Sequence, residues 1–96
     1  MARTLAANVR RERMRTARRK GKHTQDQWHA LVAHCGNRCV ICGATGRSLE
    51  RDHILPICHG GSDSIRNIQP VCSSCNSRKG LDGKDHRPSG WEGAVL

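Results

Sequence analysis

Four of the six cysteines in this 96-residue chain stand in two pairs with the spacing of metal ligands. Cys39 and Cys42 form the first pair, and Cys72 and Cys75 form the second. Two thiolates separated by two residues face the same point across a tight turn, and four complete the closed tetrahedral site of structural zinc. A disulfide within one pair would be a strained, redox-type bridge. The pattern therefore predicts one structural Zn²⁺. The ion would stabilise a chain that is too short to form a large hydrophobic core.

Residues between and just after the cysteine pairs are of the types that hydrolyse a phosphodiester. That reaction needs a base for the attacking water and a cation on the anionic phosphate. Imidazole exchanges protons near neutral pH, so His53 is the candidate base. Asp52 offers a carboxylate oxygen and Asn76 a carbonyl oxygen, which are ligands that suit Mg²⁺ or Mn²⁺. We therefore expect a catalytic divalent ion on Asp52 and Asn76.

Asp52 and His53 are neighbours in the sequence, and neighbours on a regular strand point to opposite faces. For both to serve one site, the strand must end or bulge near residues 54–56. Asn67 is no base, but its amide can hydrogen-bond across the connection that follows the strand. We expect Asn67 to hold the backbone around His53 and so fix the direction of its ring.

The elements that position these residues follow from local patterns. Residues 48–54 and 68–71 are predicted strands, and residues 55–67 form a connection much longer than the usual hairpin loop of about two to five residues. A short helix, capped by Ser73 or Ser74, follows the second strand. The predicted order is strand, long loop, strand and helix, with the zinc site holding both ends.

A further helix is predicted over residues 24–35, ahead of the first cysteine pair. Thr24 and Gln27 have the spacing of a capping box. Apolar residues recur along one face of this helix, at Trp28, Leu31, Val32 and Cys35. This pattern places Cys35 in the core rather than among the metal ligands, and Gly36 suits the position after the helix end.

The chain is strongly basic, with 17 Lys and Arg against 8 Asp and Glu and a formal charge of +9. Such an excess favours polyanionic partners and salt-sensitive association with them. Residues 1–22 concentrate this charge, and their like charges repel at helical spacing. We expect this arm to be disordered or frayed in isolation and to become helical on DNA. A solvated tail without function is the alternative.

No long apolar segment accompanies this charge. Residues 1–22 lack the apolar region of a secretory signal, although an organellar transit peptide shares their composition. No run of about 18 or more apolar residues would span a bilayer. We expect a cytoplasmic protein, and in a reducing compartment cysteine pairs bind metal rather than form disulfides.

Several sequence blocks of this region resemble the HNH endonucleases, which share a ββα-metal core. The blocks are Asp52–Pro56, Gly60–Asp63, Asn67–Cys72 and Cys75–Lys79. The resemblance covers residues 35–80 and rests on several independent motifs. It implies that His53 is the general base, that Asn67 is the orienting residue, and that Asp52 and Asn76 are the metal ligands.

At the third position of the family's motif this chain has Asn76 rather than His, and Gly80, one turn later, supplies no further imidazole, so the resemblance implies two protein ligands with waters completing the shell. Mg²⁺ suits such a shell better than Ni²⁺ or Zn²⁺. The family usually leaves a 5′ phosphate and a 3′ hydroxyl. Short members are frequent in phage genomes, and some act with the terminase in DNA packaging. The resemblance thus suggests host cytoplasm as the location, and terminase or another targeting protein as a partner.

Together these features predict a small, zinc-stapled α+β domain that cuts DNA. The expected division is a basic arm over 1–22, the nuclease domain over 23–80 and a tail over 81–96. The candidate DNA contacts are basic side chains near the site and in the arm: Arg78, Lys79, Arg51, Arg66, Arg10, Arg11, Arg13, Arg18 and Arg19. No role is assigned to Cys58, His59 or Trp91. The rival hypothesis is a non-catalytic zinc-ribbon module that binds DNA and has no use for His53 or Asn76.

Overall fold

The computed structural model describes residues 5–91, so the first four residues of the arm and residues 92–96 of the tail lie outside the described part. The described chain is α+β, as predicted. Its helices, strands and 3₁₀ turns follow in the order α1 (Leu5–Arg19), α2 (Gln25–His34), β1 (Leu49–His53), η1 (Ile57–His59), η2 (Ile65–Asn67), β2 (Ile68–Cys72) and α3 (Ser73–Lys79).

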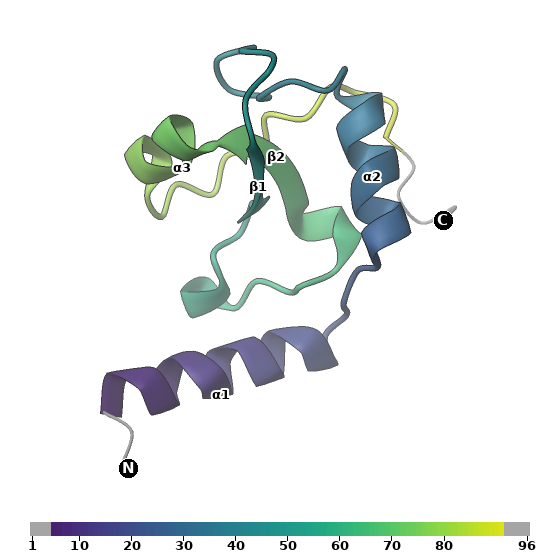
Figure 1. Ribbon diagram of the computed structural model, residues 1–96. Helices are drawn as coiled ribbons and strands as arrows, with labels where there is room; N and C mark the ends of the chain where they lie inside the picture. The colour runs from purple at the N-terminus through teal and green to yellow at the C-terminus, as the bar shows by residue number, and fades with distance from the viewer. Residues whose placement is uncertain (1–4, 92–96) are drawn as a thin grey trace.

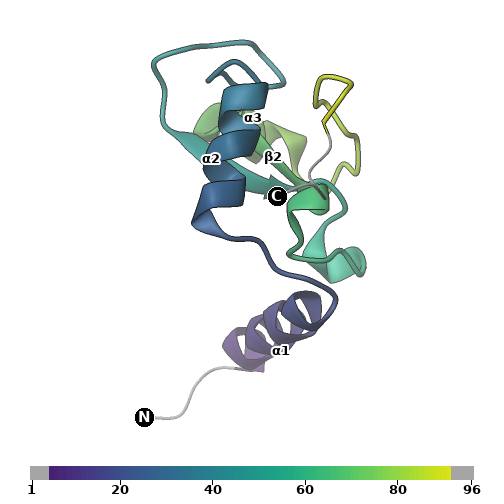
Figure 2. The same ribbon diagram turned by 90° about the vertical axis from the view of Figure 1, so that its right-hand side faces the viewer.

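The two strands form an antiparallel hairpin that α2 and α3 flank (Figure 1). Leu49 pairs with Cys72 at one end and His53 pairs with Ile68 at the other. Every residue of β2 is buried. Figures 1 and 2 show α2 and α3 on opposite sides of the hairpin, and both pack against β2. The two strands expected from the sequence are confirmed.

The main core lies between α2 and the hairpin. Its buried members are Trp28, Leu31, Cys35, Ile65 and Ile68. The predicted face of α2 is therefore the face that packs, and Cys35 belongs to the core. Burial raises the pKa of the Cys35 thiol to about 11, as expected for a sulfur surrounded by apolar groups.

The predicted capping box begins α2. Thr24 Oγ1 accepts from the backbone N–H of Gln27 at 3.1 Å, and Gln27 Oε1 accepts from the backbone N–H of Thr24 at 2.8 Å. The predicted cap of α3 is wrong. Cys72 occupies the N-cap position without a side-chain hydrogen bond, because β2 runs into α3 without a loop. Ser73 is already the first helical residue.

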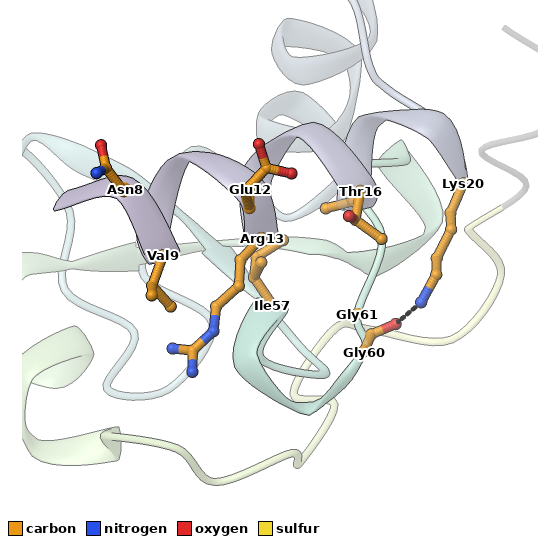
Figure 3. Close-up of a pocket in the computed structure, with 10 residues that line it drawn as sticks. Asn8, Val9, Glu12, Arg13, Thr16, Lys20, Ile57, Gly60 and Gly61 are labelled. Carbon is orange, nitrogen blue, oxygen red and sulfur yellow. Dashed lines mark hydrogen bonds between the residues drawn. The ribbon is translucent and has the colours of Figure 1, made fainter. Parts of the chain in front are cut away.

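The arm differs most from expectation, because residues 5–19 are helical without DNA. Contacts with the long loop account for this. Ala17 of α1 is only 2% exposed, its carbonyl accepts from the backbone N–H of Asp63 at 3.3 Å, and Lys20 Nζ donates to the carbonyl of Gly60 at 2.9 Å. These tertiary contacts offset the repulsion among the arginines. A groove of about 370 Å³ runs between α1 and η1 (Figure 3).

The described part of the tail packs back on the domain. Trp91 packs against the main core, and its ring lies 5.3 Å from that of His34. Gln69 in β2 holds the segment between, since its Oε1 accepts from the backbone N–H of His86 at 2.8 Å. Among residues 5–91, none of the helices has the length and apolar character that a membrane span requires.

Candidate zinc centre and catalytic site

The four paired cysteines converge on one point. Their sulfur atoms all lie within 4.8 Å of one another. Cys39, Cys72 and Cys75 are buried together with Val71, whereas Cys42 is exposed. Four thiol ligands grouped in this way are positioned to hold one zinc ion, as the spacing predicts.

Local backbone geometry favours the thiolate form of two of the four cysteines, Cys39 and Cys72, whereas burial raises the pKa of Cys75 to about 11. Burial by itself raises the pKa of Cys39, but backbone N–H groups, first that of Cys42, outweigh it and lower the pKa to about 6. The backbone N–H of Cys75 likewise lowers the pKa of Cys72. Hydrogen bonds that favour thiolates over thiols suit zinc, because the thiolate is the form that binds it.

His53 is the last residue of β1, and its ring lies against the long loop. Its Nε2 atom is 2.8 Å from Oδ1 of Asp63, a buried carboxylate. The next residue, Ile54, donates its backbone N–H to the carbonyl of Asn67 at 2.8 Å. The strand thus ends at His53, where the sequence required it to end or bulge, and the ring remains partly exposed.

Asn67 spans the base of the loop between the strands. Its Oδ1 accepts from the backbone N–H of Leu55 at 2.8 Å, while its Nδ2 donates to the carbonyls of Leu55 at 3.0 Å and Ser62 at 2.8 Å. Gly61 lies directly beneath, where a Cβ would come 1.9 Å from the carbonyl oxygen of Leu55. The side-chain amide of Asn67 therefore joins the two sides of the loop. The loop can close this tightly only because residue 61 is a glycine.

Asp52 faces α3 from the interior of the hairpin. It is 7% exposed, and its Oδ2 accepts from Gln69 Nε2 at 2.9 Å. Lys79 Nζ lies 3.3 Å from the same oxygen. On α3, Asn76 donates its Nδ2 to Oε1 of Glu50 at 2.7 Å. Glu50 was missed as a neighbour of this region, although its position two residues before Asp52 on a strand signals the same face.

Asp52, His53 and Asn76 nevertheless line one hollow, of about 300 Å³. The hollow lies between the end of β1, η1 and the end of α3. Its other lining residues are Arg51, Pro56, Ile57, Cys58, Gly80 and Leu81. The structure therefore gathers a partly exposed imidazole, a carboxylate and an amide around one space. Asp52 and Asn76 supply oxygen donors that fit a hard divalent ion.

Most of the expected DNA contacts in the domain are exposed, but one is not. Arg66 and Arg78 are exposed, and Arg51 is exposed while its guanidinium lies 4.8 Å from the ring centre of Trp28. The expectation for Lys79 is wrong. Its side chain is 2% exposed and turned inward, where it pairs with Asp52 and donates to the carbonyl of Asp82.

The arginines of α1 divide between two faces. Arg13 lines the groove beside η1 (Figure 3). The other candidate DNA contacts of the arm lie together on a second, basic surface, which also includes Met14, Arg15 and Lys22. These candidates are Arg10, Arg11, Arg18 and Arg19. Cys58 is exposed and lines the hollow, and His59 follows it on η1.

Comparison with known proteins adds to this geometry. Residues 39–81 match the family model described as HNH endonuclease. The chain is 33% identical over 61 residues to "Protein ea31" of Escherichia phage lambda, a match that covers 62% of this chain and 21% of that protein. It is 29% identical over 41 residues to "Anaredoxin" of a Nostoc species, with 43% of this chain and 54% of that protein covered.

The chain thus spans about a fifth and about half of the lengths of these two relatives. The matched segment contains both cysteine pairs, the hairpin, the loop with Asn67 and all of α3. Residues 39–81 of this protein are therefore similar to an HNH endonuclease domain.

Proposed function

We propose that the protein is a metal-dependent endonuclease that hydrolyses phosphodiester bonds of DNA, with His53 as general base. The observation that carries the proposal is the common hollow of Asp52, His53 and Asn76 in a domain of this family. A nuclease-type function agrees with the family, and the excess of positive charge agrees with a polyanionic substrate.

In this mechanism His53 accepts a proton from the attacking water. Its Nε2 is engaged by Asp63, so Nδ1 is the nitrogen available for this step. Asn67 holds the ends of the loop and thereby the backbone beyond His53. Asp52 and Asn76 would hold Mg²⁺ or Mn²⁺, which when bound neutralises charge on the scissile phosphate and the departing oxygen. Arg78, an exposed residue of α3 whose guanidinium also donates to Sγ of Cys75 at 3.5 Å, contacts the backbone of the DNA.

A plasmid-nicking assay tests the proposal. Supercoiled DNA is incubated with the protein in Mg²⁺ or Mn²⁺, and the open-circular product is followed with and without EDTA. The wild-type protein is expected to nick only with metal, and His53→Ala to lose activity. His59→Ala is the matched control, because His59 is an exposed histidine of the same loop that does not line the hollow. Equal nicking by wild type and His53→Ala would remove His53 from the mechanism.

A second candidate function is a DNA-binding module without catalysis. The observation that favours it is the internal pairing of both proposed metal ligands, Asp52 with Lys79 and Gln69, and Asn76 with Glu50. This candidate predicts salt-dependent DNA binding, unchanged in His53→Ala, and no nicking with either metal. The same assay, paired with a mobility shift, separates the two functions.

A further inference from the structure

The carboxylate of Asp63 contacts the ring of His53. Oδ1 of Asp63 lies 2.8 Å from Nε2 of His53, and the two side chains are 13% and 23% exposed. A carboxylate only accepts hydrogen bonds, so Nε2 carries the proton of the neutral ring. Nδ1 is then left with the lone pair. A carboxylate in this position selects both the tautomer and the direction of an imidazole, as it does in serine protease triads.

Asp63 is itself held from outside the loop. His23 donates its Nδ1 proton to the carbonyl of Asp63 at 2.8 Å, and the same nitrogen lies 3.7 Å from Oδ1. The backbone N–H of Asp63 donates to the carbonyl of Ala17 in α1 at 3.3 Å, and Lys22 forms a parallel bridge with Asp63. Both backbone polar groups of Asp63 are therefore bound by the segment between residues 17 and 23.

The loop residues just before Asp63 are also held by hydrogen bonds from other segments. Lys20 at the end of α1 reaches across to the carbonyl of Gly60, a contact that Figure 3 shows beside the groove. From the other side, Asn67 donates to the carbonyl of Ser62. The segment 60–63 thus lies between the basic arm and the amide that closes the loop.

We propose that Asp63 is a positioning residue that fixes the tautomer and direction of His53, and that the end of the basic arm, residues 17–23, holds Asp63 in place. The inference rests on the proposed function of His53. It gives the arm a task besides DNA affinity: without it, the imidazole loses its orientation. His53 would then remain in the hollow, but its lone pair would not be directed at the water.

The first test is Asp63→Asn, which keeps the shape of the side chain but removes the obligatory acceptor. Nicking is measured under single-turnover conditions with saturating enzyme, and DNA affinity by mobility shift. The rate is expected to fall roughly 10²- to 10⁴-fold, by analogy with triads that lose their carboxylate, with DNA affinity unchanged. Asp63→Glu is expected to recover part of the rate. Asp26→Asn, which removes an exposed acid from α2, is the control and should nick like wild type.

The arm is tested by His23→Ala, which should lower the single-turnover rate without loss of DNA affinity. Zinc content and circular dichroism show whether each variant is folded. A wild-type rate in Asp63→Asn would overturn the proposal. So would equal losses of rate and affinity in Asp63→Asn, because a positioning residue acts on the chemical step alone.

A spectroscopic measurement separates this inference from the proposed function. Nitrogen-15 NMR of the His53 ring, in protein without DNA, reports which nitrogen carries the proton. The inference predicts an Nε2–H ring in the wild type and a mixed or inverted tautomer in Asp63→Asn. If no variant nicks DNA but the ring behaves in this way, the nuclease proposal fails and the pairing stands. An Nδ1–H ring in the wild type would reject the pairing, whatever the activity.

Discussion

The ammonium of Lys79 lies 3.3 Å from Oδ2 of Asp52, and solvent reaches only 2% and 8% of the two side chains. Gln69 donates to the same oxygen. A carboxylate shut away from water requires such partners, because an unpaired buried charge is costly. The sequence predicted Lys79 as a DNA contact. Its ammonium instead neutralises the carboxylate of Asp52, the same carboxylate that the proposed metal ion would bind.

Replacing Lys79 by Met should therefore destabilise the zinc-loaded protein in the absence of Mg²⁺ by roughly 3–5 kcal/mol, the usual cost of breaking a buried ion pair. Urea denaturation measures this change. Mg²⁺ should stabilise Lys79→Met more than it stabilises the wild type, because a divalent ion replaces the missing positive charge. Lys84→Met, at an exposed position, serves as control. An unchanged midpoint in Lys79→Met would contradict the buried pairing.

Zinc removal should unfold the domain around both cysteine pairs. We expect one zinc per chain by elemental analysis and loss of cooperative thermal unfolding after treatment with a strong chelator, since binding of such an ion is folding free energy. Cys75→Ser should lose the metal. Cys58→Ser should keep it, because Cys58 is exposed and outside the cluster of four sulfurs. Wild-type zinc content in Cys75→Ser would refute the assignment.

Asn67→Ala removes three hydrogen bonds across the loop, two of them donated and one accepted. The expected loss of stability is roughly 1–3 kcal/mol, because backbone groups of Leu55 and Ser62 lose their partner. Nicking should fall roughly 10- to 100-fold, as when a catalytic group is displaced by about 1 Å. Full activity in Asn67→Ala would show that the loop closes without this amide.

Gly61→Ala tests the closure of the same loop from the backbone side. The added Cβ would meet the carbonyl oxygen of Leu55 at 1.9 Å, so the backbone must move. We expect destabilisation of roughly 1–3 kcal/mol, the range of overpacked sites. Gly83→Ala is the matched control, because its Cβ would approach other atoms no closer than an ordinary 3.8 Å. Thermal unfolding of the two variants should differ clearly, and similar curves would argue against a tight loop.

The basic surface of α1 should govern the salt dependence of DNA binding. Arg18 and Arg19 are exposed and belong to the basic surface rather than to the lining of the groove beside η1. Replacing both with Gln should reduce the slope of log K against log salt by about 0.9 for each phosphate that the variant no longer neutralises. The single-turnover rate at saturating enzyme should stay the same, unlike that of His23→Ala. A slope equal to that of wild type would place these arginines outside the DNA interface.

Local patterns in the sequence were sufficient to predict several features of the fold and of the candidate site. The capping box of Thr24 and Gln27 correctly marks the start of α2, and the spacing of the cysteines identifies the four grouped sulfurs. The residue types at Asp52, His53 and Asn76 also single out three side chains that line one hollow. Each of these signals is short in sequence and tied to one kind of chemistry.

The features that could not be predicted from the sequence depend on contacts between segments that are distant in the chain. The helix of the arm rests on Gly60 and Asp63, 40 or more residues away, which no local pattern encodes. The inward turn of Lys79 could not be read from the sequence, because a seven-residue helix has too few apolar positions to define its buried face. The pairing of Asp63 with His53 is hidden for a similar reason, since the loop between the strands has no periodicity.

The contacts of His23 and Lys20 join residues that are 40 positions apart in the chain. On a ribosome the arm emerges well before the loop, so it has nothing to bind until Gly60 and Asp63 have been synthesised. Asn76 and the last cysteine of the zinc cluster emerge later still. A translation product that stops before α3 would therefore carry the arginines without Asn76 and the complete zinc cluster, and nearby DNA would meet the complete proposed site only after α3 has been made.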